Sequence, residues 1–327
     1  MEEIQKKSKK ILEKLPLPTG KYGLNIEINP GFDFSKIKKE ISNPKRDIKS
    51  QEAIISQKIT PKEKQFFSKD FNDDSYEYHL LTANANNFLV INIPKELKKP
   101  IEIDQEITEQ TISFILILAE PNSKAQILLK KTGKADIAGD DIRVIAKENA
   151  KLDIITLQNL DPKTINIQRR NSAQKKDSEV NWVDVCLGTS YTKSDVIGSL
   201  NEPGAIVNNK VIYLANKSQK FDIYTASIHN APDTSSDIVT KGVLNDNAKA
   251  LSRGLVKINK NAPGSNGYET QDALLLSNKA EADAIPNLEI NNNDVKCSHG
   301  STVGQVDEDK LFYLMTRGLT KDEASQK

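Results

Sequence analysis

Two residues near the end of the chain, Cys297 and His299, have the types and spacing of metal ligands. They stand two positions apart in the segment NDVKCSHGSTV. Because side chains alternate between the two faces of a β-strand, a strand here places both on one face, with their backbone positions about 6.6 Å apart. A thiolate and an imidazole so placed can bind one metal ion, or one edge of a cluster, together. Since two ligands cannot close a four-coordinate site, the others must come from a partner, from sulfide or from solvent.

The surroundings of this pair leave two interpretations open. Gly300, Gly304 and several hydroxyl residues flank it, which suits an open and approachable site. The alternative is a small buried cysteine next to an incidental surface histidine, because a free cysteine commonly packs as a small hydrophobe. His229, which precedes a Pro-containing turn in SIHNAPDTSSD, is a candidate third ligand. Its own alternative is a hydrogen bond that stabilises the turn.

The remaining polar residues give weaker signals. Cys186 lies in the alternating segment VNWVDVCLG and is expected to pack in the interior. The pair Asp140–Asp141 is predicted to lie in a turn, because neighbouring residues of a strand point to opposite faces. The pair Arg169–Arg170 is predicted to lie in a solvated basic loop. The sequence holds no G-x-S-x-G, P-loop or G-x-G-x-x-G motif, so hydrolase, NTPase and dinucleotide-binding functions lack their usual support.

Charge and hydropathy exclude several classes of protein. Lys plus Arg number 46 and Asp plus Glu 45, for a net charge of +1, so no overall field favours nucleic acid or an anionic membrane. No apolar run has the length of a signal peptide, and none approaches the ~18 residues of a membrane span. We therefore expect a cytoplasmic protein without nucleic-acid or membrane partners. In a reducing compartment, Cys186 and Cys297 would be free thiols.

A repeated pattern of turns and strands predicts the fold of residues 76–299. Short β-branched runs are separated by Asn, Gly, Asp and Pro, with almost no helical periodicity between them. A turn with a small residue at its exit precedes a strand in PNSKAQILL, KENAKLDIITL, NEPGAIVNN, NDNAKALSRGLVKI and SNKAEADAIPNLEI. Without helical crossovers, the candidates are a β-sandwich or barrel and a parallel β-solenoid. Small residues at successive turn exits favour the solenoid, in which one coil stacks on the next.

The chain divides into three parts on this basis. Residues 1–75 are an irregular and helical N-terminal region that begins with an amphipathic helix over 2–15, residues 76–305 are the solenoid core, and residues 306–327 are a C-terminal helical arm. In the arm, Asp307 can cap a helix that Gly318 ends, and Thr320 with Glu323 forms a second capping box. Because the open ends of a solenoid need covering, we expect the N-terminal helix and the arm to cover them. A second copy or a related chain could instead add strands there.

The segment NDVKCSHGSTVGQVDEDKLFYLMTRGL resembles the SufB/SufD family of iron–sulfur cluster assembly proteins, and the SufD branch in particular. The segments HNAPDTSSDIVTKGVL and YETQDALLLS resemble it too. Gln271 stands where the SufB branch has its scaffold cysteine, and Gly300 stands where that branch has a glutamate. Both departures favour the SufD branch, although the N-terminal region is shorter than is usual there.

This resemblance implies a right-handed parallel β-helix core with short helical N- and C-terminal regions. It implies a scaffold subunit rather than an enzyme, with a SufB-like partner at the solenoid end and a transient iron–sulfur cluster formed at that interface with Cys297 and His299. It further implies a SufC-like ATPase held by the C-terminal arm, through Leu311, Phe312, Tyr313, Leu314 and Arg317. Whether the isolated chain also forms a homodimer stays open.

Two other functions stay open at this point. One is a structural β-solenoid interaction protein in which the Cys-x-His pair is incidental. The other is a carbohydrate-active enzyme on a β-helix, such as a polysaccharide lyase or hydrolase. That enzyme would need carboxylates or basic residues clustered on one face at matched positions of successive turns, and the sequence offers no such set.

Overall fold

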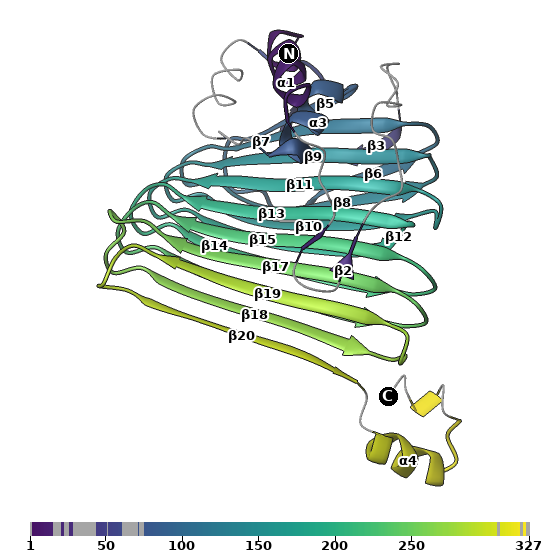
Figure 1. The fold of residues 1–327 in the computed structure, drawn as a ribbon. Helices are drawn as coiled ribbons and strands as arrows, with labels where there is room; N and C mark the ends of the chain where they lie inside the picture. Colours follow the sequence, from purple (N-terminus) through teal and green to yellow (C-terminus); the bar gives the residue numbers. More distant parts are fainter. Residues whose placement is uncertain are drawn as a thin grey trace.

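The chain forms a coil whose successive turns build two stacked nine-stranded sheets, as a computed structural model shows (Figure 1). The structure describes residues 2–15, 21–22, 26–28, 44–50, 52–60, 71, 75–305, 308–320 and 323–324. Each coil gives one strand to each sheet, and strands of successive coils pair in parallel. The predicted parallel β-solenoid is therefore confirmed.

The two sheets are named here by their last strands. Working toward the C-terminus, the β20 sheet contains β6 (Ile101–Ile107), β8 (Lys124–Gly133), β10 (Lys151–Leu160), β12 (Glu179–Gly188), β14 (Ile206–Ala215), β16 (Ser235–Leu244), β18 (Asn266–Leu275) and β20 (Lys296–Gln305). The β19 sheet contains β5 (Asn87–Ile93), β7 (Thr111–Ala119), β9 (Ile137–Ala146), β11 (Ile165–Gln174), β13 (Tyr191–Leu200), β15 (Lys220–His229), β17 (Lys249–Ile258) and β19 (Glu281–Ile290).

The interior between the sheets is filled by every second side chain of each strand. β10 shows this alternation plainly, since Leu152, Ile154 and Leu160 are buried while Ile155 between them is exposed. Trp182 and Phe221 pack in the same core from opposite sheets. Full burial of an aliphatic or aromatic side chain contributes roughly 1.5–3 kcal/mol, so the stacked core stabilises the coil.

The small residues that recur before the predicted strands lie at the turns between strands. Ala150, Ala205 and Ala248, each just before a strand, are fully buried where successive coils stack. Asn122 and Asn149 have φ values of 60° and 56°, the left-handed conformation that asparagine tolerates better than most residues. The sequence repeats turn residues followed by a small residue because the turns of successive coils stack on one another and leave little room there.

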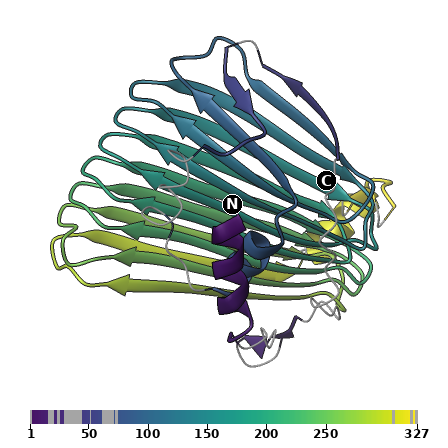
Figure 2. The ribbon, with the colours of Figure 1, turned by 90° about the horizontal axis from the view of Figure 1, so that it is seen from above.

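The N-terminal region covers the solenoid in a different way from the one predicted. β3 (Lys45–Lys49) and β4 (Ile54–Ser56) pair antiparallel with β6 and β5, so two strands cover the N-terminal edges. The helices α1 (Glu2–Leu12) and α3 (Tyr76–Asn84) instead lie outside the strands (Figure 2), where Arg143 of β9 donates to Thr82 of α3. A small antiparallel pair, β1 (Lys21–Tyr22) and β2 (Ile26–Glu27), completes the described part of this region. None of the described helices combines the length and hydropathy that spanning a membrane requires.

The C-terminal end of the solenoid is open. β19 and β20 are the last strands of their sheets, and no described strand pairs with their outer edges. The helix α4 (Glu308–Thr316) lies beyond β20 rather than across the ends of the two sheets (Figure 1). The expectation that the C-terminal arm covers this end was therefore wrong for the described residues of the arm.

Candidate metal centre

Cys297 and His299 both lie on β20, the last strand of the open end. In the register of the sheet, Cys297 is opposite Gly267 and His299 is opposite Glu269 of β18. Glu269 is fully buried between the sheets, so the two ligand candidates stand on the inward-facing positions of the last strand. The predicted arrangement on one strand face is confirmed.

The Cys297 thiol lies beside the backbone of Gly267. A Cβ added to Gly267 would be 3.5 Å from Cys297 Sγ and 2.5 Å from Val256 Cγ1. Cys297 is half-buried and packs against a small apolar cluster that includes Ile238 and Ile258. The thiol therefore sits at the rim of the core, with the exposed His299 next to it along the strand.

The environment of Cys297 disfavours a free thiolate. Burial raises the pKa of Cys297, and the nearby negative charge of Glu269 raises it further. A bound metal ion reverses this preference, because it replaces the thiol proton and neutralises the sulfur charge. The site is thus better suited to a metal-bound sulfur than to a free nucleophilic one.

Glu269 is a residue of this end that the sequence analysis missed. Its Oε1 accepts a hydrogen bond from Gln271 Nε2 at 2.5 Å, whereas its Oε2 is buried without a partner in the described structure. Burial raises the pKa of Glu269 to about 7, and the hydrogen bond from Gln271 acts in the opposite direction. The signal in the sequence was the alternation in GYETQDA, which puts Gly267, Glu269 and Gln271 on one face once the register with Cys297 is known.

His229 lies away from this pair, in a hydrogen-bonded corner at the end of β15. Its Nδ1 and Nε2 are each 2.8 Å from a hydroxyl oxygen, those of Thr234 and Ser236. The side chain is fully buried, and burial lowers the pKa of His229 to about 4. With both ring nitrogens already hydrogen-bonded, the arrangement is the turn-stabilising one, and the structure does not bring His229 together with Cys297 and His299.

The ligand set of the open end is incomplete in the described part of the chain. No three His, Cys, Asp or Glu side chains there are arranged to hold a metal ion. A metal ion bound to Cys297 and His299 would need further ligands from outside the chain, or side chains that move on binding.

A buried polar network occupies the middle of the solenoid and corrects two predictions. Asp140 of β9 accepts from both Lys131 and Arg170, and Arg170 Nε is also 3.3 Å from Asp184 Oδ1. The predictions of a turn at Asp140–Asp141 and a solvated loop at Arg169–Arg170 were therefore wrong. These residues lie in β9 and β11, strands that are buried on both faces because α3 covers them from outside.

Cys186 belongs to the same interior, as predicted. Its Sγ is 3.5 Å from Asp184 Oδ2, and the side chain is fully buried. Burial, together with the Asp184 charge, raises the pKa of Cys186 well above its ordinary value. Cys186 is therefore an unreactive packed thiol, in contrast to Cys297.

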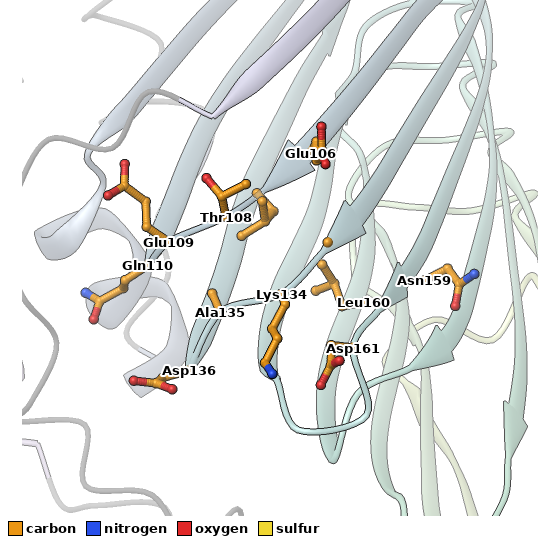
Figure 3. A pocket seen from close by; sticks show the side chains of 12 residues that line it. Glu106, Thr108, Glu109, Gln110, Lys134, Ala135, Asp136, Asn159, Leu160 and Asp161 are labelled. Atoms are coloured by element: carbon orange, nitrogen blue, oxygen red, sulfur yellow. The ribbon is translucent and has the colours of Figure 1, made fainter.

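A groove lies at the turns of the first coils, several coils away from Cys297. It has a volume of about 930 Å³ and is lined by Glu106, Glu109, Lys134, Asp136 and Asp161, among others (Figure 3). The acidic side chains stand apart along its rim, with Lys134 between them. The groove holds no thiol or imidazole and does not extend the Cys297 site.

The C-terminal arm exposes much of the surface predicted for partner binding. Phe312 and Tyr313 of α4 are 69% and 57% exposed, whereas Leu311 is buried and Leu314 is half-buried. The exposed Arg317 guanidinium lies 5.1 Å from the centre of the Tyr313 ring.

The predicted helix signals of the arm are confirmed where they are described. Gly318 ends α4 with a φ of 94°, and Glu323 Oε2 accepts from the backbone N–H and the hydroxyl of Thr320 at 2.8 Å each. The predicted cap at Asp307 lies outside the described residues.

Comparison with known proteins identifies the family. Residues 103–326 match the family model described as SUF system FeS cluster assembly, SufBD core domain. Over 99% of its length the chain is 25% identical to an iron-sulfur cluster assembly SufBD family protein of Staphylococcus saprophyticus, of which it covers 73%. It has the same identity and coverage with a protein of that description from Staphylococcus aureus strain MRSA252. With more than half of its residues matched, this β-solenoid belongs to the SufB/SufD family of iron–sulfur cluster assembly proteins.

Proposed function

We propose that the chain is a cytoplasmic, non-enzymatic scaffold subunit of a SUF-type complex and takes the SufD-like place in it. Membership of the family gives it a role in iron–sulfur cluster assembly. The observation that carries the finer proposal is the position of Cys297 and His299 on inward-facing sites of the last strand, at an end that no described strand covers. A SufB-like partner can add its own strands there and supply the missing ligands.

The chemistry of the pair fits iron and sulfide as the materials assembled. A thiolate is a soft ligand and an imidazole a borderline one, and both occur in iron–sulfur centres. The departures at Gln271 and Gly300 support the SufD-like assignment, because the position of the SufB scaffold cysteine is taken here by an amide that donates to Glu269.

The exposed aromatic surface of α4 supports docking of a SufC-like ATPase. Phe312 and Tyr313 project from a helix that stands beyond the solenoid, and exposed aromatic residues are frequent anchors of interfaces. ATP hydrolysis would then take place on the partner.

Iron and sulfide analysis of an anaerobically reconstituted complex tests the proposal. Cys297→Ser and His299→Ala should each lower the iron and sulfide content while leaving the fold intact, since neither opens a large cavity. Ser298→Ala is the matched control, because Ser298 lies between them on the opposite strand face. The double variant should lose little more than the worse single one, since residues that serve one site are not additive. Full iron and sulfide content in the double variant would reject the proposal.

A structural interaction protein without metal chemistry is the second candidate function. The packing of Cys297 on an apolar cluster is the observation in its favour. The same measurement separates the two functions, because a packed structural thiol would leave iron and sulfide content unchanged when it is replaced.

A further inference from the structure

Glu269 lowers the stability of the open end, and packing does not explain why a carboxylate is present there. The residue is 0% exposed, and its Oε2 has no hydrogen-bond partner in the described structure. A buried and unpaired acceptor destabilises a fold, and a charged one destabilises it more. A glutamine of the same shape would avoid the part of this cost that comes from burying a charge.

The missing side chain of Gly254 nevertheless leaves space for this carboxylate. A Cβ on Gly254 of β17 would lie only 1.4 Å from Glu269 Oε1, so the carboxylate occupies a space that any other residue at position 254 would fill. Gln271 Nε2 borders the same space and holds Oε1 in place. The carboxylate is therefore held between the two sheets, one coil from the open end.

Glu269 is also next to both candidate ligands. It is the register partner of His299, and neighbouring strands of a sheet lie about 4.8 Å apart. Its charge acts on the Cys297 thiol. Carboxylate, thiolate and neutral imidazole together carry two negative charges, which match one divalent cation.

We propose that Glu269 is a charge-compensating residue of the metal site, which favours the binding of a divalent cation such as ferrous iron at Cys297 and His299. Without metal, the carboxylate and a Cys297 thiolate destabilise each other. A bound divalent cation removes this repulsion, while the thiol proton leaves to solvent. As no three described side chains form a ready ligand set, the role is that of a neighbouring charge rather than a pre-formed ligand. The inference rests on the proposed metal site and adds a residue to it.

Anaerobic titration of the purified full chain with Co²⁺, a spectroscopic stand-in for ferrous iron, tests this role. Glu269→Gln should weaken Co²⁺ binding about tenfold, or about 1.4 kcal/mol. The thiolate-to-cobalt absorption band should persist, because Cys297 remains. Glu269→Asp, which keeps the charge, should restore most of the affinity. Glu289→Gln is the matched control, since it removes a charge from the outer face of the last coil, where Glu289 pairs with Lys257 at 2.7 Å.

The unfolding temperature of the metal-free chain distinguishes a charge-compensating role of Glu269 from a structural one. Glu269→Gln keeps an oxygen that can accept from Gln271 and turns the unpaired oxygen into an amide. The metal-free variant should therefore unfold at the same or a higher temperature, whereas a structural role predicts a lower one.

The outcomes separate this inference from the proposed function. Unchanged Co²⁺ affinity in Glu269→Gln, with a loss in Cys297→Ser, overturns the charge-compensating role and leaves the metal site standing. Unchanged affinity in both variants overturns the metal site itself. Should Glu269→Gln fail to fold, normal affinity in a folded Glu269→Ser variant would overturn the charge-compensating role, and weakened affinity would support it.

Discussion

The Cys297 thiol and Gly267 are register partners, and the thiol borders the space where a side chain on Gly267 would begin. That space also borders Ser236 Oγ, which is 3.4 Å from the position of a Cβ on Gly267. A methyl group on Gly267 would crowd Val256 on the other sheet, whereas it would meet the thiol at an ordinary contact distance of 3.5 Å.

Gly267→Ala should destabilise the chain by crowding Val256, while the added methyl meets the Cys297 thiol at ordinary contact distance. The added methyl would lie 2.5 Å from Val256 Cγ1, and overpacking of this kind typically costs about 1–3 kcal/mol. Urea unfolding measures the loss. Gly300→Ala is the control, since nothing lies within 4 Å of its added Cβ and its effect should be within about 0.5 kcal/mol. Equal effects of the two substitutions would contradict this account.

His229 should make the fold sensitive to mild acid. Its pKa is about 4 in the folded chain and near 6.5 when unfolded, so the unfolded state binds a proton that the folded state resists. Stability from this residue is complete above pH 6.5 and falls as the pH drops toward 4, by about 3 kcal/mol in total. Urea unfolding between pH 4 and 7.5 should show a shallower slope for His229→Gln than for the unchanged chain. Ser298→Ala, which removes no titratable group, should leave the slope as it was, and a curve for His229→Gln parallel to that of the unchanged chain would show that His229 does not set the slope.

The solenoid could be predicted from the sequence because its signals are local. A small residue before a strand, an Asn or Asp in the turn, and alternation along the strand each report on a few neighbouring positions. Cys297 and His299 were predicted for the same reason, since their spacing within one strand already places them on one face. Their inward direction is settled by the pairing of β20 with β18.

The buried polar residues could not be predicted because their partners are distant in sequence. The strand β11, INIQRRNSAQ, looks like a surface segment, yet it is buried on both faces. Arg170 is compensated by Asp140, which is 30 residues away, and Arg169 donates to Ser75, which is 94 residues away. Glu269 was missed in the same way, because its burial follows from Gly254 on the other sheet.

Arg170 should be essential to the interior network. Arg170→Met leaves Asp140 and Asp184 with less positive charge around them, and removing one partner of a buried ion pair typically costs about 3–5 kcal/mol. Lys45→Met is the control, because Lys45 and Glu106 form a surface pair with 86% and 54% of their side chains exposed. Such a pair contributes roughly 0–1 kcal/mol. A loss in Arg170→Met no larger than that of the control, measured by urea unfolding, would mean that the network rearranges around the missing guanidinium.

The exposed face of α4 should bind a partner without stabilising the chain. Phe312→Ser should change the free energy of unfolding by less than about 0.5 kcal/mol, because the ring is already 69% exposed. The same substitution should weaken capture of a co-expressed SufC-like ATPase at least tenfold, since aromatic anchors of interfaces often contribute about 2 kcal/mol or more.

Deletion of residues 306–327 should abolish capture of the ATPase and leave the solenoid folded. Leu214→Ser serves as the control, because Leu214 is an exposed apolar residue on β14, outside the arm. ATPase capture that survives the deletion would place the docking surface elsewhere on the chain, whereas equal losses in Phe312→Ser and Leu214→Ser would indicate nonspecific apolar contact.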